Sequence, residues 1–281
     1  MIWDTILCIC GYDLLSEGGI DMKSPAQIAA AYETAGTAKT RLSFGKTFIL
    51  GIMAGAFIAL GGLGSQIASV CAPDPSTGRL ISSIVFPIGL FMVIIGGAEL
   101  FTGNCLIIVP VLSGKATIKG MARNLGIVYL GNMVGGIIIA LLANFSHTYA
   151  FADGKLAQAV VATAAAKSNI SFMDGLLKGI LCNILVCMAV WCSFAAEEAA
   201  GKVLTLWFPV MLFIIGGFEH CVANMYFIPA GMIASSVYGI SAEGLSVFGF
   251  LVTNLIPVTI GNIIGGSLCV GATYFAAYLK D

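Results

Sequence analysis

The chain has 281 residues, of which 59% are apolar and only 10% are charged, and its mean hydropathy is +1.00. A soluble domain carries about 25% charged residues, so the composition excludes an ordinary soluble protein and indicates an integral membrane protein. The net charge of −1 gives no indication of nucleic-acid binding. The nine cysteines include no CxxC or CxxCH motif, so we predict no metal site and no cofactor.

The first part of the chain precedes the apolar runs. Residues 1–21 lack the basic start and the cleavage site of a signal peptide, and Met22 is an alternative start, so we predict a leader of uncertain structure. Segment 22–41 opens with Ser24-Pro25-Ala26-Gln27, the pattern of a helix N-terminus. Four residues then share one face, namely Ile28, Ala31, Tyr32 and Ala35. We predict a cytoplasmic amphipathic helix that lies on the membrane surface or packs beneath the bundle.

The remaining chain, 44–281, is predicted to be a transmembrane channel domain. A membrane span needs about 20 predominantly apolar residues. Six runs meet this length: 47–70, 83–112, 121–145, 172–196, 203–236 and 246–279. Lys and Arg are more frequent on the side of the N-terminus, which predicts a multi-pass protein of the plasma or inner membrane with both termini in the cytoplasm.

The two halves of the domain share a sequence plan. Three motifs occur once in each half: Phe-Pro at 86–87 and 208–209, Ile-Ile-Gly-Gly-x-Glu at 94–99 and 214–219, and Gly-Asn-x-x-Gly-Gly at 131–136 and 261–266. Three spans per half is an odd number, so the halves must cross the membrane in opposite directions. We therefore predict an all-α, aquaporin-like fold with six transmembrane helices in an inverted 3+3 repeat. The Gly-Asn motifs are interpreted as close-packing signals.

The second and fifth spans are each interrupted by a polar patch. A Gly-Gly pair loosens the helix before each patch, and irregular backbone at this depth is tolerated only where it is buried in protein or lines a wet cavity. We therefore predict loops at 98–104 and 217–224. The half-helices that follow would point their N-termini, with free N–H groups, toward the centre and favour an anion there.

Glu219 and His220 stand inside an otherwise apolar run. A charged group at the bilayer centre costs about 2.5–3.5 kcal/mol on insertion scales, so such residues are usually functional. We predict that His220 lines a polar pore; the alternative is a histidine satisfied by a neighbouring carbonyl. Glu99 and Glu219 each precede an asparagine by five residues, Asn104 and Asn224, and we predict that these four residues anchor the loops.

Three segments resemble the formate/nitrite transporter family: Ala98–Asn104, Gly217–Pro229 and Asn254–Asn262. The resemblance extends from about Ser24 to Leu279. It implies a homopentamer in the lipid membrane with one pore in each protomer. The implied permeants are small anions, namely formate, nitrite, hydrosulfide, acetate or lactate. Gly103-Asn104 differs from the Ser-containing sequence of some formate channels, so the identity of the anion stays open.

The resemblance also assigns pore residues. It makes His220 the pore histidine and proton donor, so that transport depends on pH, and it places Thr102 beside it. Lys167 corresponds to a lysine near the outer mouth that attracts the anion. The other implied pore residues are Leu100 and Phe101 in the first loop, Phe86, Leu90, Leu100 and Phe213 at apolar constrictions, and Asn183 on the fourth span.

Two other classes of protein fit the sequence less well. A neutral-solute pore of aquaporin type usually has Asn-Pro-Ala at both half-helices, whereas here the asparagines stand in Thr102-Gly103-Asn104 and Ala223-Asn224-Met225. A membrane enzyme or redox protein has no bis-His haem site or nucleophile–base pair to use, so we predict no enzyme. The choice between channel and proton-coupled transport, the direction of flux and the role of the N-terminal helix stay open.

Overall fold

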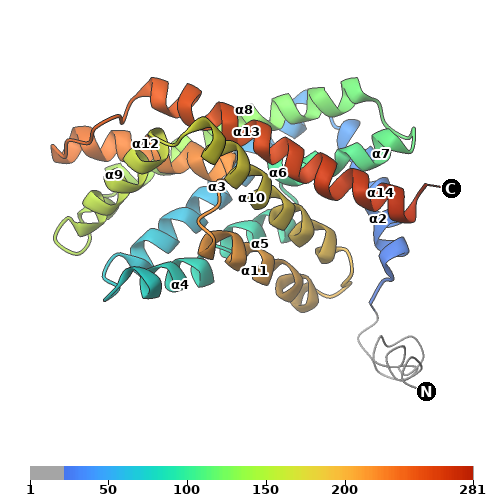
Figure 1. Ribbon diagram of the computed structural model, residues 1–281, viewed down its shortest axis with the longest axis horizontal. Coiled ribbons are helices and arrows are strands. Elements are labelled where there is room, and N and C mark those ends of the chain that lie inside the picture. Colours follow the sequence, from blue (N-terminus) through green and yellow to red (C-terminus); the bar gives the residue numbers. More distant parts are fainter. Residues whose placement is uncertain (1–21, 281) are drawn as a thin grey trace, which may run out of the picture.

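The computed structural model describes residues 22–280, so the predicted leader 1–21 lies outside the described residues. The regular elements in this range are helices (Figure 1). Within residues 22–280, six helical stretches are long and apolar enough to cross a membrane. The prediction of an all-α, multi-pass membrane protein is therefore confirmed.

The helices follow one another with short connections. The first half contains α2 (Pro25–Thr40), α3 (Phe44–Ser69), α4 (Pro75–Val85), α5 (Ile88–Ile95), α6 (Phe101–Asn104), η1 (Cys105–Ile107), α7 (Ile108–Leu112) and α8 (Ile118–Phe145). The second half contains η2 (Thr148–Ala150), α9 (Lys155–Ser168), α10 (Phe172–Ser193), α11 (Ala199–Ile215), α12 (Cys221–Tyr238), η3 (Gly249–Leu255), α13 (Ile256–Ile263), η4 (Ile264–Ala272) and α14 (Thr273–Tyr278). Elements η3 and η4 are π-helical turns within the last span.

Two helices differ from the sequence prediction. The second span starts at Pro75 rather than at 83, because Asp74 caps α4 by accepting the amide N–H groups of Ser76 and Thr77. The short helix α9 was not predicted, because its 14 residues are too few to span a membrane. It buries Leu156 and other apolar residues and packs beside α12 (Figure 1).

Helix α2 packs beneath the bundle with a face that differs from the predicted one. Ile28 and Tyr32 are buried as expected, but Glu33 and Gly36 are buried in place of Ala31 and Ala35. Glu33 is held there by an ion pair with Lys115. Burial alone would raise the pKa of Glu33, but hydrogen bonds from Lys115 and Ser113 outweigh it and hold the pKa below its ordinary value. The carboxylate therefore stays ionised, and paired with Lys115, at mildly acidic pH.

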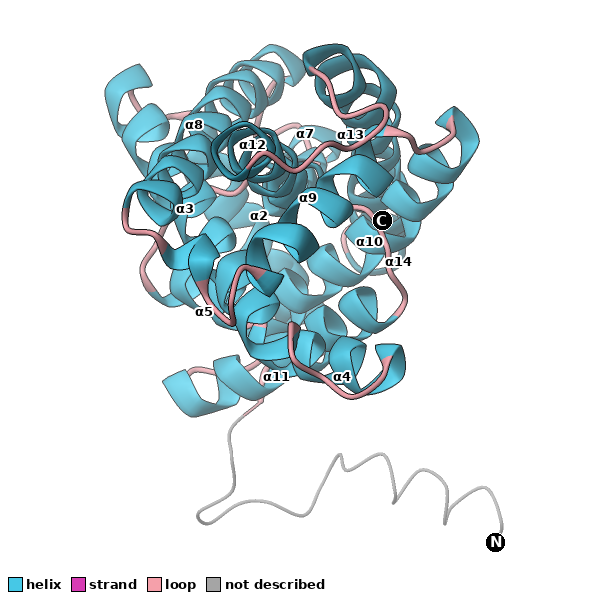
Figure 2. Cartoon of the chain, turned by 90° about the vertical axis from the view of Figure 1, so that its left-hand side faces the viewer, coloured by secondary structure: helices cyan, strands magenta, loops and turns pink. Residues whose placement is uncertain are grey.

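The breaks in the second and fifth spans are confirmed, but they are shorter than predicted. The backbone turns at Gly97 and Gly217, whose φ angles of 71° and 64° lie in the left-handed region that favours glycine. Helix resumes at Phe101 and at Cys221. Asn104 and Asn224 therefore lie inside helices rather than in loops. Figure 2 shows α12 surrounded by other helices near the middle of the bundle.

Glycines bring the spans into backbone contact, as the Gly-Asn motifs predicted. A Cβ on Gly55 of α3 would lie 2.1 Å from the carbonyl oxygen of Asn132 on α8. A Cβ on Gly265 would lie 2.3 Å from the carbonyl oxygen of Ile180 on α10. Only glycine fits at such distances, so these helix pairs depend on it for their approach.

Candidate functional site

A small cavity lies between the two helix breaks, and we call it the waist. Its volume is about 10 Å³, which is about the space of one water molecule. Its lining consists of Ile58, Phe86, Leu90, Leu100, Val186, Val210, Phe213 and His220. His220 is the one polar side chain in this lining. The four residues predicted at apolar constrictions thus come together, and the rings of Phe86 and Phe213 meet edge to face with centroids 5.4 Å apart.

Two larger cavities adjoin the waist. Cavity 1 has a volume of about 490 Å³ and shares Leu90 and Leu100 with the waist. Cavity 2 has a volume of about 630 Å³ and shares Phe213 and His220 with it. The three cavities therefore lie in a row with the waist in the middle, and we call this row the path.

The two large cavities lie toward opposite ends of the spans. Helix α10 contributes Lys178, near its start, to cavity 2 and Ser193, at its end, to cavity 1. Helix α11 runs the other way, with Lys202 at cavity 1 and Phe213 at cavity 2. The path thus follows the direction in which the helices would cross a membrane.

His220 and Thr102 meet beside the waist. The imidazole Nε2 lies 2.8 Å from Thr102 Oγ1, and Nδ1 accepts the amide N–H of Ala223 at 3.0 Å. Because Nδ1 is an acceptor, the proton of the neutral ring sits on Nε2, so Nε2–H donates to the threonine hydroxyl. Nδ1 also serves as the N-cap of α12. Thr102 is fully buried and is absent from the cavity lining, so it contacts the path only through His220.

Two predicted pore residues lie behind the path rather than along it. Asn183 is fully buried and donates to the carbonyl oxygens of Thr102, at 3.2 Å, and of Asn262, at 2.6 Å. Phe101 packs its ring against Tyr129, with centroids 4.9 Å apart. Neither residue lines the waist or the two larger cavities. Asn183 therefore supports the backbone that carries Thr102.

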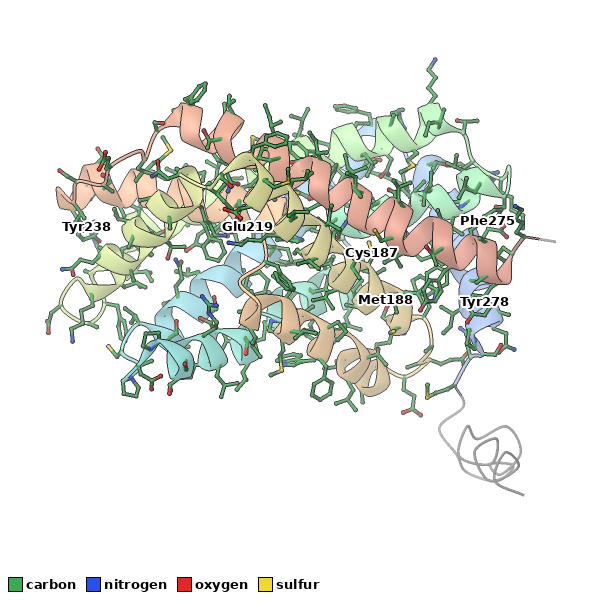
Figure 3. All side chains as sticks on the ribbon, in the orientation of Figure 1. Cys187, Met188, Glu219, Tyr238, Phe275 and Tyr278 are labelled. Atoms are coloured by element: carbon green, nitrogen blue, oxygen red, sulfur yellow. The ribbon has the colours of Figure 1, made fainter. Side chains whose placement is uncertain are left out.

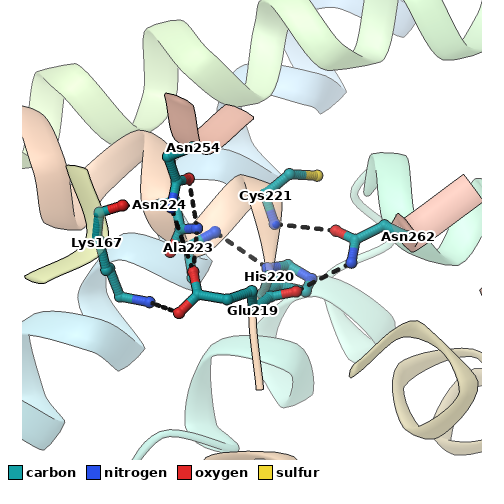
Figure 4. A network of polar contacts seen from close by, with 8 residues as sticks. All are labelled: Lys167, Glu219, His220, Cys221, Ala223, Asn224, Asn254 and Asn262. Atoms are coloured by element: carbon teal, nitrogen blue, oxygen red, sulfur yellow. Dashed lines mark hydrogen bonds and ion pairs between the residues drawn. The ribbon is translucent and has the colours of Figure 1, made fainter. Parts of the chain in front are cut away.

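Glu219 is the centre of a polar network near the middle of the molecule (Figures 3 and 4). Its carboxylate accepts from Lys167 Nζ at 2.8 Å and from Asn224 Nδ2 at 2.7 Å. Asn254 accepts from Asn224 at 2.8 Å and donates to the carbonyl oxygen of Lys167 at 3.0 Å. Lys167 lines cavity 2, but its charge is already paired with Glu219.

The first half repeats this network residue for residue. Glu99 accepts from Lys39 Nζ at 2.6 Å and from Asn104 Nδ2 at 2.6 Å. Asn124 accepts from Asn104 at 2.8 Å and donates to the carbonyl oxygen of Lys39 at 3.2 Å. Sequence reasoning missed Lys39, Asn124 and the role of Asn254. A spacing signal was present. Asn124 stands eight residues before Asn132, and Asn254 stands eight residues before Asn262.

Each half-helix also has its first amide capped by an asparagine. Asn132 accepts the N–H of Phe101 at 2.9 Å and donates to the carbonyl oxygens of Gly51 and Glu99. Asn262 accepts the N–H of Cys221 at 2.9 Å and donates to the carbonyl oxygens of Gly179 and Glu219. Figure 4 shows its contacts with Cys221 and Glu219. The expectation of free N–H groups was therefore wrong for the first amide of each half-helix, because an asparagine side chain accepts it.

These features define a class of protein: a helical membrane protein with a constricted path along its spans. The sequence pattern described as formate/nitrite transporter matches residues 26–276. The chain therefore belongs to the formate/nitrite transporter family.

Relatives of known sequence agree with this assignment. The chain is 41% identical over 262 residues to the uncharacterized transporter YrhG of Bacillus subtilis, covering 92% of this chain and 94% of the relative. It is 41% identical over 247 residues to the formate channel FocA of Haemophilus influenzae, covering 83% of this chain and 86% of that relative. It is 37% identical over 279 residues to the formate channel FocA of Escherichia coli K12, covering 95% and 98%.

Two solved structures share the fold. One is described as a pentameric formate channel with formate bound, with a TM-score of 0.77, 36% identity and coverage of 84% of this chain and 98% of that one. The other is described as an ion channel of the same family, with a TM-score of 0.81, 30% identity and coverage of 89% and 98%. The protein is thus a membrane transport protein by family and by fold.

Proposed function

We propose that this protein conducts small monovalent anions of weak acids, with formate as the first candidate, through one pore in each protomer of a homopentamer. The observation that carries the proposal is an apolar waist with a single polar side chain, His220, between two cavities that each contain a Lys–Glu pair. Formate channels among the relatives and a formate-bound pentamer among the structures support it. Nitrite, hydrosulfide, acetate and lactate are the other permeants to test.

We infer that the two halves form an inverted repeat. The duplicated networks around Glu99 and Glu219 support this, as does the opposite course of the second and fifth spans: α4 starts at cavity 2 with Arg79, whereas α11 starts at cavity 1 with Lys202. Cavity 1 contains the α2 residues Tyr32 and Lys39. With both termini in the cytoplasm, cavity 1 faces the cytoplasm and cavity 2 faces the outside.

The waist selects by size and by hydration. An ion must shed most of its water between the apolar side chains of the waist. This requirement favours small anions of weak acids, because protonation converts them into neutral molecules. At this point the imidazole of His220, whose Nε2–H donates to the buried hydroxyl of Thr102, is the polar side chain that an anion meets. If His220 acts as a proton donor, a second proton must displace the Ala223 amide from Nδ1. The geometry thus supports a hydrogen-bonding role for the neutral ring and makes proton donation the step to test.

The function is tested by flux into liposomes that contain the full-length protein. A panel of formate, nitrite, hydrosulfide, acetate and lactate at two pH values should show selective anion uptake. Osmotic swelling with glycerol and water tests the aquaporin-like alternative in the same vesicles. Rapid glycerol or water movement without anion uptake would contradict the proposal.

Replacing His220 should flatten the pH profile of anion flux. His220→Phe removes both the titratable ring and the N-cap of α12, whose loss costs about 0.5–2 kcal/mol of stability. His220→Asn is the matched variant, because asparagine is a good N-cap but does not titrate. Both variants should transport formate with a flat pH profile, and only His220→Phe should lower thermal stability. Unchanged flux together with an unchanged pH profile in both variants would remove His220 from the mechanism.

Leu100→Ala should relax size selectivity. Leu100 lines both the waist and cavity 1, and its truncation removes three methylene- or methyl-sized groups from the constriction. We expect lactate flux to rise relative to formate flux, measured as a ratio in one preparation. The matched control is Leu106→Ala, which truncates a buried leucine outside the path. The same permeability series in wild type and Leu100→Ala would show that this residue does not limit passage.

A further inference from the structure

Cavity 2 contains more positive charge than its carboxylate neutralises. Its charged lining consists of Arg79, Lys167, Lys178 and Glu219. The 2.8 Å bond between Lys167 and Glu219 makes that pair neutral as a unit. Arg79 and Lys178 are left over, so their two positive charges face a water-accessible space next to the waist.

Neither Arg79 nor Lys178 has a carboxylate partner among residues 22–280. Arg79 is exposed, and its guanidinium donates to the carbonyl oxygen of Ile215 at 3.4 Å, at the end of α11. Lys178 is half-buried on α10. The ion pairs within the described range involve other lysines. Both side chains therefore keep donors that a ligand can use.

The guanidinium of Arg79 and the backbone of Lys178 both lie against the break that ends at His220. The guanidinium Nη1 of Arg79 is 3.4 Å from the position of a Cβ on Gly217. The carbonyl oxygen of Lys178 accepts the amide N–H of Glu219 at 3.3 Å. Because the break 216–220 leads directly to the waist, an anion held by these two residues would stand immediately before the constriction.

Cavity 2 also contains a polar donor without a partner among residues 22–280. The amide nitrogen of Gln66 is buried and has no hydrogen-bond partner, while its oxygen accepts from Tyr226 at 3.3 Å. Gln66 lines cavity 2 together with the two cations. A buried donor without a partner is rare in proteins, and a bound anion would satisfy it.

We propose that Arg79 and Lys178 form an anion-binding site in cavity 2, where a small carboxylate or a similar monovalent anion is held before it enters the waist. A guanidinium suits this ligand because it binds a carboxylate through two parallel hydrogen bonds. The inference rests on the proposed transport of small anions and deepens it. It assigns recruitment of the anion to these two residues rather than to Lys167, whose charge is already paired.

Cavity 1 provides an internal comparison. Its lysines are Lys23, Lys39 and Lys202, of which Lys39 pairs with Glu99 and Lys23 lies 3.4 Å from Glu197. One cation, Lys202, is left over there, against two in cavity 2. The two sides of the pore should therefore differ in apparent affinity for an anion, with tighter binding on the side of cavity 2.

The test is anion current through the full-length protein in planar bilayers, with sodium formate applied to each side in turn. In Arg79→Gln/Lys178→Gln the formate concentration for half-maximal current should rise about tenfold on one side only, at about threefold for each charge removed. The rise should appear at an ionic strength of about 0.01 M and shrink at about 0.1 M, where the Debye length is about 10 Å. Arg79→Lys with Lys178 intact keeps the charge but loses the two parallel hydrogen bonds, so its half-maximal formate concentration should lie between those of the wild type and the double variant.

Lys155→Gln is the matched control, because Lys155 is exposed on α9 and does not line cavity 2. Lys202→Gln should raise the formate concentration for half-maximal current on the opposite side of the bilayer. A double variant that assembles and conducts with wild-type half-saturation on both sides at both ionic strengths would overturn the binding site and leave the proposed transport intact. A wild-type protein that carries no anion current would instead overturn the proposed function itself.

Discussion

Asn262→Leu is expected to destabilise the protein by about 3–5 kcal/mol, because it removes three buried hydrogen bonds and leaves their backbone partners unpaired. The amide N–H of Cys221 and the carbonyl oxygens of Gly179 and Glu219 would lose their partners. Water cannot replace them at this depth. The break before α12 would then lose the contact that ties it to α10 and α13.

The measurement is the melting temperature of the detergent-solubilised assembly, followed by size-exclusion chromatography, together with formate flux. We expect a decrease of about 10 °C and loss of most flux. Asn132→Leu should behave in the same way, since Asn132 makes the matching three bonds in the first half. Asn144→Leu is the control, because the buried side-chain oxygen of Asn144 has no partner to lose. If Asn262→Leu melts within about 2 °C of the control, the capping role assigned to Asn262 is wrong.

Lys167→Met should also destabilise the assembly strongly, by about 3–5 kcal/mol, because it leaves the buried carboxylate of Glu219 without its cation. The side chains of Lys167 and Glu219 are only 17% and 8% exposed. The amide donors Asn224 and Asn254 would still reach the carboxylate, but they carry no charge. The folded state would therefore contain an uncompensated charge.

A double-mutant cycle isolates this effect. Lys167→Met/Glu219→Gln removes both charges, so its loss of stability should be smaller than the sum of the two single losses. The pair Lys39 and Glu99 gives a second, independent cycle in the first half. Melting temperatures of the assembly provide the readout, and strictly additive losses in both cycles would show that the ion pairs contribute nothing through their contact.

Several features of this protein followed from local sequence alone. Runs of apolar residues predicted the membrane spans, since length and hydropathy decide whether a helix can cross a bilayer. The Gly-Gly pairs predicted the two breaks, because Gly97 and Gly217 adopt positive φ angles that other residues avoid. The matching motifs of the two halves predicted corresponding positions for Glu99 and Glu219. His220 was found because an ionisable residue in an apolar run is costly.

The tertiary structure alone decided which groups meet. Pairing of Lys167 with Glu219, capping of Cys221 by Asn262 and support of Thr102 by Asn183 join residues 41 to 81 positions apart. No local pattern encodes such contacts, because side-chain partners across a bundle depend on how the helices pack. Packing also places Thr102 behind His220 and leaves Arg79 and Lys178 in cavity 2 without a carboxylate partner among residues 22–280. Local hydrophobicity thus determines where the chain crosses the membrane, whereas long-range packing determines which charges an anion can reach.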